Sequence, residues 1–346
     1  MDAWRNSFWQ HLAAGFGSIR RSNESVALFT SGLAVVTTGL LLLLSNARYL
    51  SSINHARTES STVSSYKRFH LYTNPLCPFA NRVWIIITEY EATDKFTFTP
   101  IPLKAELMRA RYLHQLPSWA HAVGANSAET LQELKDWYME NINKAGEVPS
   151  LTDDEALDNS AVFKESDVIS EYLATVLEAK HPQKLHLFPS AEFSAEDIAR
   201  FRLAIKSFPI SNFYACLKNQ DPVKDAELFA ALCKGLGTFV SHMSPDGPFI
   251  LGRRFTFADI YCIPFIVRFA ILLPHYRGMD MFHPSVGFDV RRFKAWFVAA
   301  SNRPSIKKTS PSEQEILRLY EGEAHEGKLN ETGFHGRGRS KMESIK

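Results

Sequence analysis

The sequence predicts an α/β domain followed by an all-helical domain, with a single membrane-spanning helix in front of both. Three observations support this prediction. An apolar run leads through a short turn and Cys77-Pro78 into an amphipathic run, which is typical of a strand followed by a helix. Beyond His181-Pro182, apolar residues recur at helical spacing over long stretches. Near the start, Val26 to Leu44 contains no charged residue.

The length of the charge-free run is close to the roughly 20 residues that a helix needs to cross a bilayer. We therefore predict a leader at 1–25, a transmembrane anchor at 26–45 and a flexible, Ser/Thr/Asn-rich linker at 46–66. A signal-peptide core and a buried apolar helix are the alternatives. Basic residues flank the run almost equally, so they hardly determine its orientation. We expect a single-pass membrane protein with its domains in the cytosol, and mitochondrial and endoplasmic reticulum membranes are the candidate locations.

Composition restricts the class of protein. The chain has 346 residues, enough for two domains, and its hydrophobic (45%) and charged (22%) contents are ordinary for globular proteins. A net charge of +2 is too small to neutralise many phosphates, so no nucleic-acid partner is predicted. The four cysteines are far apart and match no zinc spacing, so we predict no metal site. Sparse cysteine use favours a reducing compartment.

The α/β domain is predicted over 67–180, with an insertion at about 104–134. Asn126 and Glu129 are expected to cap a helix that runs from the insertion through Leu131, Leu134 and Trp137. The predicted strands and helices, in order, are a strand at 69–72, a helix at 79–90, a strand near 96–101, strands around 150–151 and 161–163, and a helix at 167–177.

The all-helical domain is predicted over 190–320. Within it, Thr256 and Asp259 have the spacing of a capping box, in which two side chains satisfy the free N–H groups at the start of a helix. Residues 321–346 mix glycine and charge with little apolar content, which predicts a disordered tail. The predicted helices lie at 195–208, 224–243, 257–272 and 291–301.

Cys77 is the main candidate for chemistry. A thiol at the first turn of a helix faces unpaired N–H groups and the positive end of the helix dipole, which favour an anion. Such surroundings lower a cysteine pKa from about 8.5 toward 3.5–7.5, so Cys77 is predicted to be a nucleophile at neutral pH. A small buried hydrophobe is the alternative. Ala80 stands where a dithiol oxidoreductase has its second cysteine, so a redox cycle must use an external thiol.

These residues give the chain a resemblance to the glutathione transferase superfamily, and most closely to its cysteine-containing lambda and omega classes. The Cys-Pro-Phe-Ala turn of a thioredoxin-like domain and the capping box of an all-helical domain both match. The likeness covers about 69–304. The matching stretches are 77–85, 137–138, 148–151, 165–173, 247–252 and 263–266.

The resemblance implies a role for each matching residue. Cys77 forms a mixed disulfide with glutathione, and the backbone of Val148, ahead of the cis-proline position at Pro149, binds the cysteinyl part of glutathione. An acid and a hydroxyl, Glu165 and Ser166, hold the γ-glutamyl end. Two further residues are placed with these in the predicted glutathione site: Phe79, close behind the cysteine, and Lys135, just before the Trp-Tyr motif.

The resemblance therefore implies an enzyme, a glutathione-dependent thioltransferase that works through a Cys77-glutathione mixed disulfide. Removal of glutathione from mixed disulfides and reduction of dehydroascorbate or of quinone adducts all use this intermediate. The co-substrate is glutathione or a related thiol, the second substrate a small disulfide or electrophile, and the protein a monomer or a homodimer. The alternative function is a non-catalytic membrane-associated protein that uses the same fold as an interaction or chloride-channel-like module.

Overall fold

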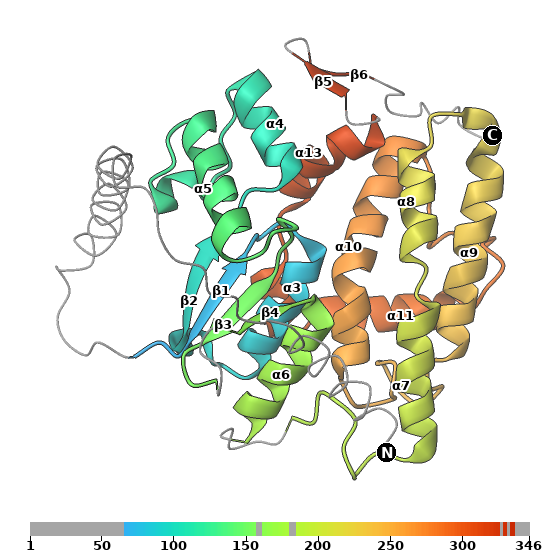
Figure 1. Ribbon diagram of the computed structural model, residues 1–346. Coiled ribbons are helices and arrows are strands. Elements are labelled where there is room, and N and C mark those ends of the chain that lie inside the picture. The colour runs from blue at the N-terminus through green and yellow to red at the C-terminus, as the bar shows by residue number, and fades with distance from the viewer. Residues whose placement is uncertain (1–65, 157–160, 180–184, 326–327, 331–332, 336–346) are drawn as a thin grey trace, which may run out of the picture. The chain divides into compact units, whose positions relative to one another are not determined.

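The structure is a computed structural model that describes residues 66–156, 161–179, 185–325, 328–330 and 333–335 (Figure 1). The predicted leader and transmembrane anchor, and the linker except its last residue, lie outside the described residues. One described helix, Phe257–Arg277, is long and apolar enough to cross a membrane, but 72% of its most apolar window is buried inside the protein. Such burial is typical of the core helix of a globular domain.

A four-stranded sheet organises the first half of the described region. The strand order is β2-β1-β3-β4, in which β2 is parallel to β1 and the other two pairs are antiparallel. This arrangement confirms the predicted thioredoxin-like domain. Its strands and α-helices are β1 (Phe69–Thr73), α3 (Pro78–Glu89), β2 (Phe96–Pro100), α4 (Lys104–Leu113), α5 (Ala128–Asn141), β3 (Ser150–Asp153), β4 (Val162–Lys164) and α6 (Ser166–Glu178).

Side chains of β1 point alternately to the two faces of the sheet, and different helices cover each face. Phe69 and Leu71 are buried in the main hydrophobic core with residues of α3 and α6. Tyr72 points to the opposite face, where its ring lies 5.6 Å from that of Tyr138 on α5. Because successive strand residues face opposite sides, one short strand carries two different layers of helices. The smaller layer, with Tyr72 and Tyr138, also contains Cys77.

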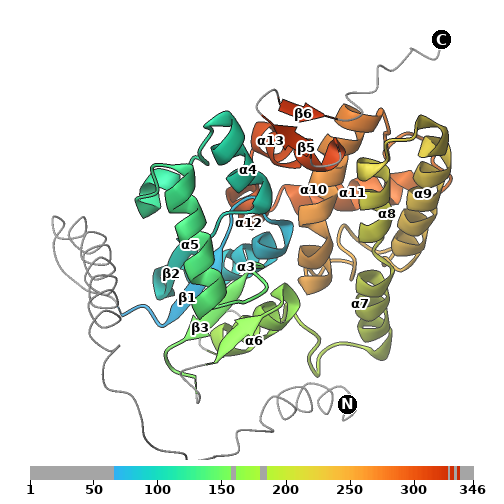
Figure 2. The same cartoon turned by 45° about the horizontal axis from the view of Figure 1, so that its top comes forward.

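The second half is helical, as predicted, and α10 lies at its centre (Figure 2). This helix packs against α3 of the first half and against α7, α8, α11 and α13 of its own half. Three of its helices, α8, α12 and α13, were not predicted. The helices are α7 (Ala195–Ser207), α8 (Ile210–Lys218), α9 (Asp225–Ser241), α10 (Phe257–Arg277), α11 (Val290–Ser301), α12 (Pro304–Thr309) and α13 (Glu313–Ala324).

The predicted capping box is confirmed. Asp259 is fully buried, and its carboxylate accepts hydrogen bonds from the Thr256 N–H at 2.9 Å, the Ile250 N–H at 2.9 Å and the Trp296 indole N–H at 2.8 Å. These bonds tie the start of α10 to the preceding loop and to α11. The capping box therefore fixes the helix that carries much of the core.

Two predicted segments differ in the structure. Residues 104–134 fold into α4, a 3-10 turn and the first half of α5, and the N-cap of α5 is Ser127, paired with Thr130, rather than Asn126 paired with Glu129. The predicted tail begins inside α13, because Ala324 is buried and its carbonyl accepts from Gln220 and Arg277. Beyond α13, a short hairpin joins β5 (Lys328–Asn330) and β6 (Gly333–His335).

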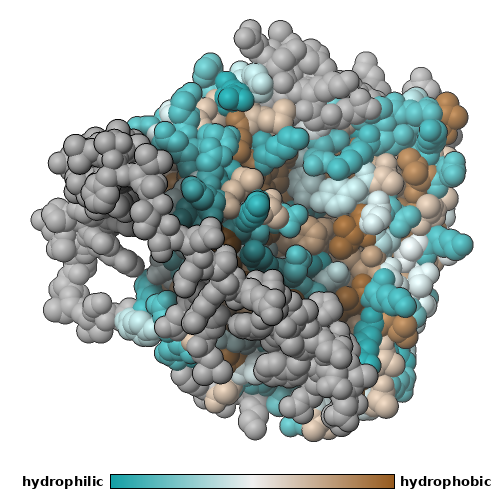
Figure 3. All heavy atoms as spheres, in the orientation of Figure 1, coloured by the Kyte–Doolittle hydropathy of each residue, from teal (hydrophilic) through white to brown (hydrophobic). Residues whose placement is uncertain are grey.

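The described surface carries charges of both signs, in line with the small net charge. Hydrophilic residues predominate on the face drawn in Figure 3, and hydrophobic residues show mainly near its middle. Large exposed hydrophobic side chains, such as Trp137 and Val223, come from separate elements. Scattered apolar residues of this kind are normal on the surface of a globular protein.

Candidate functional site

Cys77 is the N-cap residue of α3, with Pro78 as the first helical residue, as the sequence predicts. The turn before it is built by Asn74, which accepts the Cys77 N–H on its backbone carbonyl at 3.2 Å and the Leu76 N–H on its side-chain oxygen at 2.8 Å. The Asn74 side chain is itself held by Glu106 and by the Ile101 carbonyl. A strand, an Asn-centred turn and a helix thus fix the position of the thiol.

The surroundings of the thiol differ from the prediction. Cys77 is only 7% exposed, and its S–H donates to the Val148 carbonyl at 3.6 Å. Burial raises the pKa of the thiol above its ordinary value, although the backbone amides of Ala80 and Phe79 act in the opposite direction. The predicted low pKa is therefore wrong for this arrangement, because loss of solvent outweighs the helix N-terminus. The thiol is protonated here.

Val148 and Pro149 lie directly beside the thiol, and the bond between them is cis. Tyr138 fixes this segment, because its hydroxyl is within hydrogen-bond distance of the Glu147 carbonyl (2.5 Å) and of the Ser150 hydroxyl (2.8 Å). The structure thus brings together Cys77 and the backbone that the resemblance assigns to the cysteinyl part of glutathione.

Lys135 and Phe79 occupy two different positions around Cys77. Lys135 is half-buried and donates to the Gly146 carbonyl, close to Val148 in the chain. Burial lowers the pKa of Lys135, while Glu106, and Cys77 in its thiolate form, act against the shift. Phe79 is 40% exposed and packs edge-on against Phe265 of α10. Lys135 thus flanks the thiol from α5, and Phe79 faces the helical domain.

Glu165 and Ser166 begin α6, but they differ in exposure. Glu165 is exposed and has a left-handed backbone with φ of 67°. Ser166 is buried, and its hydroxyl accepts a hydrogen bond from Arg82 of α3 at 3.1 Å. The serine predicted to bind the γ-glutamyl end is therefore linked, through Arg82, to the helix that carries Cys77.

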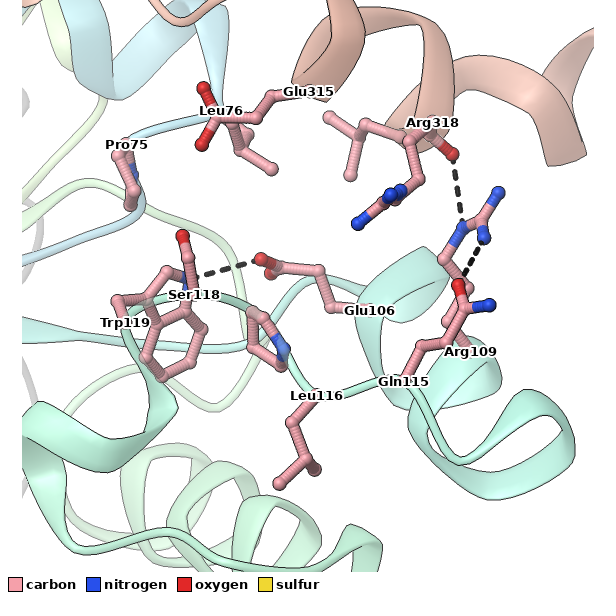
Figure 4. Close-up of a pocket in the computed structure, with 12 residues that line it drawn as sticks. Pro75, Leu76, Glu106, Arg109, Gln115, Leu116, Ser118, Trp119, Glu315 and Arg318 are labelled. Carbon is pink, nitrogen blue, oxygen red and sulfur yellow. Dashed lines mark hydrogen bonds between the residues drawn. The ribbon is translucent and has the colours of Figure 1, made fainter.

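A cavity of about 100 Å³ lies next to this site (Figure 4). Its walls come from the turn before Cys77, from α4 and the segment after it, and from α13. Glu106 faces Trp119 across the cavity and accepts its indole N–H at 3.0 Å. The lining residues are Pro75, Leu76, Glu106, Arg109, Gln115, Leu116, Pro117, Ser118, Trp119, Glu315, Arg318 and Leu319.

Helix α13 lines the cavity from the side of the helical domain. It packs against α4, α8 and α10, and Arg109 of α4 pairs with Glu321 and donates to the Arg318 carbonyl. Tyr320 is 5% exposed, its hydroxyl is 3.4 Å from that of Tyr214, and the charges of Cys77 and Arg268 act on it. Tyr320 of α13 is thus near enough to interact electrostatically with Cys77, whereas the buried residues packed around the sulfur belong to its own domain.

We expect Tyr320→Ala to raise the alkylation rate of Cys77 by about tenfold at constant pH. Loss of the ring removes part of the contact that keeps α13 in place, and tenfold corresponds to about 1.4 kcal/mol of opening free energy. Iodoacetamide labelling followed by mass spectrometry measures the rate. Tyr320→Phe keeps the ring and is expected to behave as wild type. Equal rates in all three proteins would show that α13 does not limit access.

Three residues of the site were not singled out from the sequence: Arg82, Glu106 and Arg268. All three are buried charged residues, which is uncommon without a partner or a function. Signals were present, because Arg82 falls within the matched Cys-Pro-Phe-Ala stretch and Arg268 interrupts the apolar run after Asp259. Glu106 lies in the predicted insertion, where the sequence offers no such signal.

Two family models match the chain, one for each half. The glutathione S-transferase N-terminal domain matches residues 76–176, and the glutathione S-transferase C-terminal domain matches residues 219–309. The chain belongs to the glutathione transferase superfamily. It is therefore an enzyme of the glutathione transferase type, and glutathione is the co-substrate of this family. Among the described residues, no group of three or more His, Cys, Asp or Glu side chains could hold a metal ion.

Curated relatives of this glutathione transferase come from plants. It is 25% identical over 187 residues to "Probable glutathione S-transferase DHAR1, cytosolic" of Oryza sativa, which covers 54% of this chain and 76% of that protein. It is 27% identical over 216 residues to "Protein IN2-1" of Zea mays, which covers 61% of this chain and 69% of that protein.

Solved structures show the same fold. A Leishmania glutathione transferase described as trimeric, TDR1, matches with a TM-score of 0.55 and 22% identity over 77% of this chain and 49% of its own. Glutathione transferase Omega 3C of Trametes versicolor matches with a TM-score of 0.52 and 20% identity over 80% of this chain and 97% of its own. These similarities confirm the thioredoxin-like domain followed by the helical domain.

Proposed function

We propose that this protein is a glutathione-dependent thioltransferase whose nucleophile is Cys77. The observation that carries the proposal is the position of one sulfur. Cys77 caps the first turn of α3 and lies 3.6 Å from the backbone of Val148, within a glutathione transferase fold. A cysteine at this place can form a disulfide with glutathione, whereas a serine or tyrosine can only activate it. The plant relatives whose names include DHAR support a reductive reaction.

The reaction has two exchange steps. The Cys77 thiolate attacks the glutathionyl sulfur of a mixed disulfide, the S–S bond breaks, and the released substrate thiolate takes a proton from solvent. A second glutathione, as its thiolate, attacks the Cys77-glutathione disulfide, which frees Cys77 and produces oxidised glutathione. One free glutathione is thus consumed for each mixed disulfide, and the glutathionyl group that the substrate carried leaves as half of the oxidised glutathione. Dehydroascorbate and quinone adducts would be reduced through the same Cys77-glutathione intermediate.

The residues around Cys77 are assigned roles within this proposal. The backbone of Val148, next to Pro149, would pair with the cysteinyl part of glutathione, while Glu165 and Ser166 at the start of α6 would hold its γ-glutamyl end. Lys135 is on the same side of the thiol as Val148, and Phe79 on the side of α10. The cavity lined by Leu76, the residue before Cys77, is the proposed place for the second substrate.

Mass spectrometry tests the proposal directly. Full-length protein treated with oxidised glutathione should gain one glutathionyl group, located at Cys77 and removed by excess reduced glutathione. The three other cysteines are free and buried, and they should stay unmodified in folded protein. Glutathionylation absent from Cys77, or confined to another cysteine, would contradict the proposal. Binding of glutathione without turnover would instead favour an interaction module.

The location at a membrane is also proposed, and the sequence alone supports it. We expect deletion of residues 1–65 to move the protein from the membrane fraction to the supernatant after alkaline extraction, because the charge-free run from Val26 to Leu44 is removed. The enzymatic unit should remain folded, since the described contacts lie between residues 66 and 335. Recovery of the full-length chain in the supernatant would contradict the predicted anchor. A protease-protection assay on sealed membranes would show whether the domains face the cytosol.

A further inference from the structure

Two arginines next to the site are buried and form no ion pair with a carboxylate of the described residues. Arg82 on α3 is 2% exposed, and Arg268 on α10 is 1% exposed. Arg268 donates to the carbonyls of Pro264 at 2.6 Å and Leu76 at 2.7 Å. Arg82 donates to the Tyr261 carbonyl at 3.0 Å and to the Ser166 hydroxyl at 3.1 Å. Both guanidinium groups are thus held by neutral acceptors.

These two charges are incompletely compensated. Within the described residues, Arg82 Nη2 and Arg268 Nε are buried and have no hydrogen-bond partner, and neither side chain takes part in an ion pair. Arg82 also lies over the Tyr261 ring, 3.5 Å from its centre. Burial lowers the pKa of Arg82, while Tyr261, Cys262 and the exposed Asp167 act in the opposite direction. A buried cation without a counter-ion is unfavourable, so an anion at this place would be stabilised.

The geometry points to the Cys77 thiolate as that anion: we propose that Arg82 and Arg268 are positioning residues that hold negative charge on the Cys77 sulfur. Arg268 binds the carbonyl of Leu76, the residue before Cys77, and Arg82 lies on the helix that Cys77 caps. The inference rests on the proposed function only in that the thiolate is the reactive form.

The direction of the charge effects agrees with this role. Burial raises the pKa of Cys77, while the positive charges of Arg268 and Arg82 lower it. Other titratable groups interact with the sulfur from three helices, α5, α8 and α13, and each is either a cation or a neutral phenol at pH 7. Besides the two arginines, they are Lys135 and Tyr138 on α5, Tyr214 on α8 and Tyr320 on α13.

The positions of the two arginines explain how a buried thiol can still be reactive. Burial opposes loss of the proton from Cys77. When the site opens or glutathione enters, solvation improves, and the positive charges of the two arginines still act on the sulfur. A Cys77-glutathione disulfide is neutral at sulfur, so attack by the second glutathione regenerates the anion next to the same two cations. The pair therefore also favours Cys77 as the leaving group of the second step.

The test is the pH dependence of Cys77 alkylation by iodoacetamide in the full-length protein. This reagent is uncharged, so a change in protein charge does not alter its approach, and the assay needs no glutathione. We expect Arg268→Met to shift the profile up by about one pH unit, which is about tenfold slower labelling at neutral pH. Arg268→Lys keeps a cation and should recover most of the rate. The same pair of substitutions at Arg82 should give shifts in the same direction.

Arg277→Met is the matched control. Arg277 is 3% exposed on the same helix and also binds backbone carbonyls, at Cys216, Leu217 and Ala324. Its removal should lower the thermal stability but leave the midpoint of the alkylation profile unchanged. The inference is overturned if Arg268→Met and Arg82→Met keep the wild-type midpoint. It is also overturned if Arg277→Met shifts the midpoint equally. The lysine variants keep the test valid if the methionine variants do not fold. A shift of about one pH unit in the lysine variants, as expected for loss of the charge, would overturn the inference too. If the alkylation profiles of wild type and variants are as expected but the wild-type protein never forms the glutathione adduct, only the proposed function is contradicted.

Discussion

Cys77→Ser is expected to lower thioltransferase activity by a factor on the order of 10³ or more, which is the scale of losing a catalytic nucleophile. A serine hydroxyl cannot form the disulfide intermediate, so the glutathione adduct seen by mass spectrometry should disappear as well. The measurement is the initial rate of glutathione-dependent reduction of a small mixed disulfide. Because Cys77 makes one weak hydrogen bond to Val148, the variant should fold as wild type.

Cys233→Ser provides a matched control for this substitution. Cys233 has the same exposure as Cys77, 7%, but lies on α9 in the helical half. Its replacement should leave the reduction rate within about twofold of wild type, as is usual for a substitution away from the site. Activity that survives Cys77→Ser, or falls equally in both variants, would show that Cys77 is not the nucleophile.

Asp259→Ala is expected to destabilise the protein by about 4 kcal/mol. Its carboxylate accepts from the N–H groups of Thr256, Ile250 and Trp296, and all three donors would be left buried without an acceptor. Urea denaturation followed by tryptophan fluorescence gives the free energy of unfolding. Asp289→Ala is the control, because Asp289 is an exposed N-cap of α11 that accepts one hydrogen bond, from Arg292. Its loss should cost about 1 kcal/mol.

The pH dependence of stability provides a second measurement on Asp259. Burial raises the pKa of its carboxyl from 3.8 to about 6, although the hydrogen bonds act in the opposite direction. Between these two values the folded state binds more protons than the unfolded state, so the contribution of Asp259 to the free energy of unfolding falls as pH rises. Asp259→Asn cannot titrate and should lack this decrease. If the free energy of unfolding of Asp259→Asn depends on pH as in wild type, the decrease comes from other groups.

Local sequence patterns predict most of the elements that position the site. Cys77-Pro78 predicts the start of α3, and Thr256 with Asp259 predicts the start of α10, because capping depends on residues only a few positions apart. Helix α8 was missed because it is short and follows Pro209 directly. The chain continues as helix past residue 320 because Ala324 is held by Gln220 and Arg277, which are far away in the sequence.

The electrostatic state of the site is much harder to predict. From the sequence, a helix N-terminus next to Cys77 suggests a thiolate, and the amides of Phe79 and Ala80 do favour one. The outcome depends on how much solvent reaches the sulfur, and residues far along the chain, such as Tyr138 and Val148, pack around it. Likewise, Arg268 becomes part of the site only because α10 packs against α3. Burial and pairing are properties of tertiary structure.

Helix α13 also has a consequence for biosynthesis. During translation, the thioredoxin-like domain leaves the ribosome well before residues 313–324 are made, and domains generally fold in that order. In the nascent chain, Arg109 of α4 lacks the partners that Arg318 and Glu321 of α13 later provide. Limited proteolysis of ribosome-bound chains should therefore find α4 more accessible before α13 is made than after it.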